Sequence, residues 1–138
     1  MRARVIWAVF AGGAIGSLAR YLVLLGVAWA GFSQSTLDLV VTTIVNLAGA
    51  FALGIIHGID SGKSEAWKGF WVTGVAGGFT TMSGLALITA GAELSLSSIG
   101  YLYWLAVFIQ VVVGVLVYAL GKKPVSYTHL TLPTNREV

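Results

Sequence analysis

Four long apolar stretches, separated by short polar segments, make up most of this sequence. A helix needs about 20 mostly apolar residues to cross the hydrocarbon layer of a membrane, and each stretch is long enough. The predicted helices cover approximately residues 5–30, 39–59, 70–92 and 99–120. The pattern therefore predicts an all-α membrane protein with four transmembrane helices.

The apolar pattern stops near residue 124, where the sequence becomes polar and shows no periodicity. We predict one four-helix transmembrane domain over residues 1–123, and a non-native or disordered tail over residues 124–138. Functional residues are therefore expected only within the first of these two segments.

Composition excludes several classes of function. Hydrophobic residues make up 57% of the chain and charged residues only 9%, which is too little charge to cover a small soluble fold. Cysteine is absent, which excludes thiolate metal sites and cysteine nucleophiles. The eight basic residues are too scattered to form a nucleic-acid-binding surface. His57 is the only histidine before the tail, and no base–nucleophile pair accompanies it, so we expect no enzymatic activity.

The distribution of charge predicts the topology. With four spans, the N-terminus, the second loop and the end of the fourth helix lie on one side of the membrane. That side carries six basic residues, whereas the opposite side carries none and has two acidic residues, Asp38 and Glu93. The positive-inside rule therefore predicts a multi-pass protein with cytoplasmic termini. The six basic residues are Arg2, Arg4, Lys63, Lys68, Lys122 and Lys123.

Glycines and hydroxyl side chains are concentrated in the third apolar stretch, over residues 74–84. Glycine disfavours continuous helix, so this composition predicts a helix broken in the middle of the membrane. Such a break is tolerated where it lines a cavity or is buried in protein, and its free carbonyls and N–H groups can bind ions. The alternative is a continuous glycine-rich helix used for packing, and the adjacent Thr80 and Thr81 favour the break.

Two other polar residues lie within predicted spans. In the second helix, Asn46 shares one face with Thr42 and Gly49. Its amide either donates N–H groups to a small anion or makes an interhelical hydrogen bond, and both readings stay open. In the first helix, Arg20 either attracts anions at a vestibule or pairs with carbonyls in a structural role, and we favour the structural role.

These residues together resemble the Fluc (CrcB) fluoride channels over about residues 5–121. That family has a glycine-rich first helix that ends in arginine, as in Gly12 to Arg20. A second-helix threonine and asparagine, followed by glycine and an aromatic residue, match Thr42, Asn46, Gly49 and Phe51. Residues 77–83 match in part the most specific element, a Gly-Gly-x-Thr-Thr-Phe-Ser-Thr-Phe break.

The resemblance implies a function and a set of site residues. It implies an antiparallel dimer in the bacterial inner membrane, with two pores that let cytoplasmic fluoride leave passively. It also implies a structural sodium ion at the dimer interface, held by the backbone carbonyls of Gly77 and Thr80. Asn46 is then a pore-lining donor, and the further polar contributors are Thr42, Thr81 and Ser83.

The sequence departs from the family at two pore elements. Two phenylalanines that the family places at the ion are Met82 and Leu85 here, and neither side chain has an electropositive ring edge. The hydroxyl track of the fourth helix is reduced to Tyr103, followed by Gln110 and Gly114.

The charge bias suggests how these departures could be accommodated. An antiparallel homodimer requires one sequence to insert in both orientations, which six basic residues against none should prevent. We therefore predict a dimer with an oppositely oriented paralogous subunit, and self-pairing is the alternative. A non-conducting accessory subunit also stays open. A small multidrug-type transporter is disfavoured, because no acidic residue lies inside a predicted span.

Overall fold

The protein is entirely helical over the residues that its computed structural model describes, 2–94 and 100–130. Within them the structure does not describe the side chains of residues 34–36, 88–89, 91–94, 100–103 and 123–130. The elements are α1 (Arg2–Ala28), α2 (Gln34–Ile59), α3 (Glu65–Lys68), η1 (Gly69–Ala76), α4 (Gly77–Phe79), α5 (Met82–Leu94) and α6 (Gly100–Leu130).

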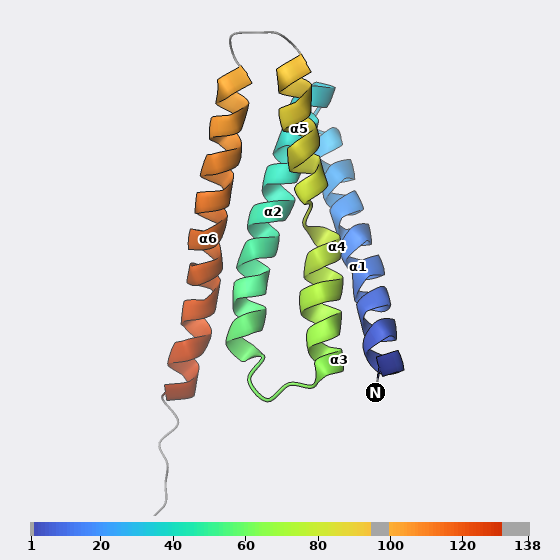
Figure 1. The fold of residues 1–138 in the computed structure, drawn as a ribbon, viewed down its shortest axis with the longest axis vertical. Helices are drawn as coiled ribbons and strands as arrows, with labels where there is room; N and C mark the ends of the chain where they lie inside the picture. The colour runs from blue at the N-terminus through green and yellow to red at the C-terminus, as the bar shows by residue number, and fades with distance from the viewer. Residues whose placement is uncertain (1, 95–99, 131–138) are drawn as a thin grey trace, which may run out of the picture.

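Four stretches of the described chain are long and apolar enough to cross a membrane, which confirms the predicted four-span fold class. Three of them are the single helices α1, α2 and α6. The third span, Glu65–Leu87, is a composite of α3, η1, α4 and the start of α5. Figure 1 shows the helices running roughly side by side, with the α3–α5 composite between α1 and α2 and with α6 against α2.

Glycines bring the helices together in two close pairs. In the pair formed by α1 and η1, a Cβ atom added at Gly74 would lie 2.8 Å from the Cα of Gly12. In the pair formed by α2 and α6, a Cβ atom added at Gly54 would clash with the carbonyl oxygen of Tyr118. Apolar side chains gain little by leaving lipid, so close approach of backbones is what membrane helices use to associate.

The interior of the isolated chain is small. Val45 is fully buried, and the cluster around it contains Leu37 and Val41. Large apolar side chains on α1 and α6 are exposed instead, among them Phe10 and Phe108. That distribution is expected where lipid or another membrane protein, rather than water, covers the outer faces.

The three segments in which the sequence places the basic residues lie together at one end of the fold. The N-terminus, the α2–α3 connection and the C-terminal end of α6 lie at the same end of the molecule in Figure 1. α6 continues past the boundary expected near residue 123, as far as Leu130. The suggestion that residues 124–138 are non-native remains a prediction, and residues 131–138 lie outside the described chain.

Candidate functional site: the interrupted third span and its cavity

The third span is interrupted at Thr80 and Thr81, which lie between α4 and α5. Thr80 has an extended backbone, with φ −80° and ψ 160°. Its hydroxyl group donates to the carbonyl of Ala76 at 2.9 Å and closes the end of α4. The hydroxyl of Thr81 accepts from the N–H of Gly84 at 3.0 Å, so Thr81 acts as the N-cap of α5. Two neighbouring threonines therefore end one helix and start the next.

The segment before the interruption is also unusual. η1 is a π-helix over eight residues, in which each N–H bonds to the fifth residue before it rather than the fourth. π-Helical turns are rare and frequently occur at functional sites. The third span therefore departs from α-helical geometry over residues 69–76 and again at residues 80–81.

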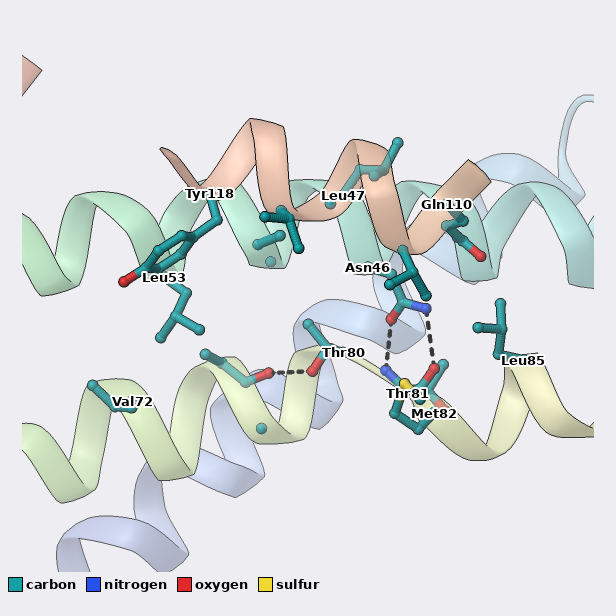
Figure 2. A pocket seen from close by; sticks show the side chains of 17 residues that line it. Asn46, Leu47, Leu53, Val72, Thr80, Thr81, Met82, Leu85, Gln110 and Tyr118 are labelled. Carbon is teal, nitrogen blue, oxygen red and sulfur yellow. Dashed lines mark hydrogen bonds between the residues drawn. The ribbon is translucent and has the colours of Figure 1, made fainter. Parts of the chain in front are cut away.

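The side chain of Asn46, on α2, forms hydrogen bonds with the backbone of the interruption. Its Oδ1 accepts from the backbone N–H of Thr81 at 2.8 Å, and its Nδ2 donates to the carbonyl of Thr81 at 3.1 Å. Figure 2 shows the amide facing the Thr81 backbone through both atoms. We call this pair of bonds the Asn46 clasp. The interhelical reading of Asn46 is thus correct, and one N–H of its amide remains outside the clasp.

The clasp and the cap together release two carbonyls. In a continuous α-helix, the N–H of Thr81 would pair with the carbonyl of Gly77, and the N–H of Gly84 with that of Thr80. Here these N–H groups donate to Asn46 Oδ1 and to Thr81 Oγ1. The carbonyls of Gly77 and Thr80 have therefore lost their usual helical partners. They are the two carbonyls that the resemblance to the fluoride channels implied as ligands for a sodium ion.

A cavity of about 440 Å³ lies beside the interruption. It is lined by residues of α2, η1, α4, α5 and α6, and its surface is mostly apolar. Figure 2 shows Asn46, Thr81 and Gln110 towards one end of it and Tyr118 towards the other. Its polar lining residues are Asn46, Thr80, Thr81, Gln110 and Tyr118. None of the described lining residues is acidic or basic.

The structure brings most of the predicted site residues to this cavity. Those that line it are Asn46, Gly77, Thr80, Thr81, Met82, Leu85 and Gln110. Met82 is 75% exposed, whereas Leu85 is only 5% exposed, so the two departures from the family pattern lie in different surroundings.

Three predicted residues lie elsewhere, and the side chain of a fourth is not described. Thr42 is buried, and its hydroxyl oxygen lies 3.1 Å from where a Cβ atom would be at Gly84. Ser83 is exposed beside Thr81, with 3.1 Å between their hydroxyl oxygens. Arg20 lies half-buried on α1 and does not line the cavity, and the side chain of Tyr103 lies outside the described residues.

One contact at the far end of the cavity was not predicted from the sequence: His57 Nδ1 lies 3.1 Å from the hydroxyl oxygen of Tyr118, which lines the cavity. The two rings also meet edge to face, with centroids 5.8 Å apart. The spacing could have indicated that Tyr118 lines the cavity, because it follows Gln110 by eight residues and lies on the same face of α6. This pair fixes the ring of Tyr118 at the cavity wall.

The fold and the site define a multi-pass membrane protein with an interrupted third span beside an apolar cavity. Residues 7–122 match the family described as CrcB-like protein, Camphor Resistance (CrcB), and the chain belongs to this family.

Similar proteins carry the name of a fluoride channel. The fluoride-specific ion channel FluC of Rhodospirillum centenum is 36% identical over 94 residues, which are 63% of this chain and 69% of that protein. The protein of the same name from Nitrobacter winogradskyi is 40% identical over 90 residues, which are 61% of this chain and 67% of that protein. Fluoride-specific ion channel FluC 2 of Leifsonia xyli subsp. xyli is 34% identical over 119 residues, covering 82% of this chain and 77% of its own length.

Proposed function

We propose that this chain is a subunit of a fluoride-selective ion channel in the bacterial plasma membrane, through which cytoplasmic fluoride leaves passively. The observation that carries the proposal is the interrupted span beside an apolar cavity, in a chain whose relatives are named fluoride-specific ion channels.

The chemistry of the cavity favours a small anion. Its polar lining side chains are amides and hydroxyls, which can donate N–H or O–H groups in place of hydration water without binding the ion tightly. An acidic side chain would repel an anion, and none of the described lining residues is acidic. The proposed contributors to the anion path are Thr42, Asn46, Thr81, Met82, Ser83, Leu85, Tyr103 and Gln110.

We also propose that Gly77 and Thr80 hold a structural sodium ion between two subunits. Support comes from their carbonyls, whose usual helical N–H partners donate elsewhere. Neutral oxygen ligands suit a hard cation, and no Cβ atom at Gly77 would meet a neighbour within 4 Å, so its surroundings are open. When bound, the ion would offset the negative ends of these carbonyl dipoles and join two interrupted spans.

The proposed assembly is an antiparallel dimer, with a paralogous subunit of opposite orientation or with a second copy of this chain. The basic residues favour the paralogue, because they lie at one end of the fold and should fix one orientation. Orientation can be mapped directly because the chain has no cysteine of its own.

Two matched variants, Ser61→Cys and Ser33→Cys, place a thiol in exposed connections at opposite ends of the fold. In intact cells, an impermeant thiol reagent should label the Ser33→Cys variant and leave the Ser61→Cys variant unlabelled. Equal labelling of the two variants would instead show that the chain inserts both ways, and would support the homodimer.

The function itself is tested by reconstituting the chain in liposomes loaded with potassium fluoride, and measuring efflux with a fluoride electrode. We expect rapid efflux after an ionophore releases the membrane potential, and no comparable chloride efflux from matched vesicles. If folded protein is silent alone but conducts with a co-expressed paralogue, it is an obligate heteromer subunit. If efflux is no faster with this chain than with the paralogue alone, the chain is an accessory subunit, and a conducting role is refuted.

A further inference from the structure

Hydrogen bonding separates the polar side chains of the cavity into two groups. The hydroxyls of Thr80 and Thr81 are engaged within the third span, and that of Tyr118 lies against His57. The amide of Asn46 is oriented by the clasp. Gln110 is the exception, because its buried Nε2 has no hydrogen-bond partner in the described part of the chain.

An unpaired amide is unexpected at this position. A buried donor without a partner destabilises the folded state, so such groups are rare unless they serve a purpose. A leucine or valine on this face of α6 would avoid that cost, as Val111 and Val115 do next to Gln110. Retaining an amide in a mostly apolar wall therefore points to a ligand that accepts hydrogen bonds.

The NH₂ group of Gln110 is not held by another part of the described chain. Rotation about the last side-chain bond exchanges the carbonyl and the NH₂ group, and Nε2 has no hydrogen bond among the described residues that would have to break. Gln110 can thus present donors to the cavity, whereas the orientation of Asn46 is set by two bonds. Figure 2 shows both amides towards the same end of the cavity.

We infer that Gln110 is a selectivity-determining donor, whose amide N–H groups bind the permeating anion as it loses water in the cavity. The inference rests on the proposed channel function. It assigns to the site one residue, Gln110, whose side chain binds the ion and has no other role. A small anion with concentrated charge gains more from such a donor than chloride does, so the amide favours fluoride.

The test compares three forms of the full-length chain: wild type, Gln110→Met and Leu116→Met. Methionine matches glutamine in length but has no N–H group. Leu116 lies on the same helix, is exposed and does not line the cavity, so Leu116→Met is the matched control. The measurements are fluoride efflux, chloride efflux, and the melting temperature in detergent with and without sodium fluoride.

Loss of a hydrogen bond to a charged ligand should slow fluoride efflux by about ten- to a hundredfold in the Gln110→Met variant. Chloride efflux should change less, so the fluoride-to-chloride ratio should fall. The melting temperature without fluoride should stay the same or rise, because no protein hydrogen bond is removed, and its rise with fluoride should shrink. The Leu116→Met variant should keep wild-type flux within about twofold, as expected for a conservative apolar exchange outside the cavity.

Each contrary result has a distinct meaning. Wild-type flux and selectivity in Gln110→Met would overturn the inference and leave the channel function intact. A lower melting temperature with an unchanged fluoride-to-chloride ratio would show that Gln110 pairs with another subunit in a structural role, which also overturns it. If wild type shows neither flux nor a fluoride-dependent melting shift, the proposed function itself fails, and the inference fails with it.

Discussion

The Asn46 clasp gives a prediction whose size can be worked from the structure. Leucine has nearly the shape of asparagine, so Asn46→Leu removes the two bonds of 2.8 and 3.1 Å to Thr81 with little change in packing. Interhelical hydrogen bonds in a membrane protein contribute on average about 0.6 and at most about 1.7 kcal/mol each. Two such bonds, one at each polar group of the Thr81 backbone, predict a loss of about 1–3.5 kcal/mol of unfolding free energy.

One competing effect sets the lower end of that range. Without the clasp, the N–H of Thr81 can return to the carbonyl of Gly77 and extend α4 by one bond, which recovers part of the loss. The same change would reorder the interruption and occupy a carbonyl proposed for sodium. We therefore expect the variant to lose fluoride efflux, and any sodium dependence of its stability, even where the unfolding free energy falls by only about 1 kcal/mol.

The assay is unfolding by sodium dodecyl sulfate in mixed micelles, followed by the fluorescence of the five tryptophans. Thr43→Val is the control, because this α2 residue donates to the carbonyl of Leu39 within its own helix at 2.8 Å. That substitution removes no interhelical bond, so it should cost about 0.5 kcal/mol or less. If Asn46→Leu proves as stable as Thr43→Val and keeps wild-type flux, the clasp does not hold the interruption and the reasoning is wrong.

The remaining predictions concern the elements around the cavity. Gly74→Ala should reduce folded yield and lower the melting temperature, because its Cβ atom would lie 2.8 Å from backbone atoms of α1, whereas Gly26→Ala has open space and should have no effect in the same expression and melting assays. Thr81→Val removes the N-cap of α5 and should cost about 1 kcal/mol in the dodecyl sulfate assay. Tyr118→Phe keeps the edge-to-face contact with His57 but loses its hydrogen bond, so it should cost about 0.5–1.5 kcal/mol there, and an unchanged midpoint would contradict it.

The sequence predicted those structural features that depend on a single segment of the chain. The length and apolar character of each stretch are local properties, so the four spans could be predicted without knowing how they pack. The concentration of glycine and hydroxyl residues in residues 74–84 is equally local. This concentration predicted an interruption in the segment in which α4 ends and α5 begins. Boundaries were less certain, and α6 extends ten residues beyond the expected end near residue 120.

The sequence could not decide interactions that depend on the register between helices. Asn46 and Thr81 are 35 positions apart, and either reading of the asparagine was compatible with its position on α2. The contact of His57 with Tyr118 depends on the register of α2 against α6, which glycines at Gly54 and Gly121 set by close approach. Periodicity places each residue on a helix face, but only packing determines which faces meet.

The two proposed ion sites share one structural cause. Asn46 accepts a hydrogen bond from the N–H of Thr81, and the Thr81 hydroxyl accepts one from the N–H of Gly84. The carbonyls of Gly77 and Thr80 therefore lose their usual helical donors. The same clasp fixes the amide of Asn46, a residue that lines the cavity, and leaves one of its N–H groups outside the two bonds. Donors for an anion and acceptors for a cation therefore arise from the same two hydrogen-bond exchanges. A substitution that acts on the clasp should consequently affect both sites, whereas one at Gln110 should affect only the anion path.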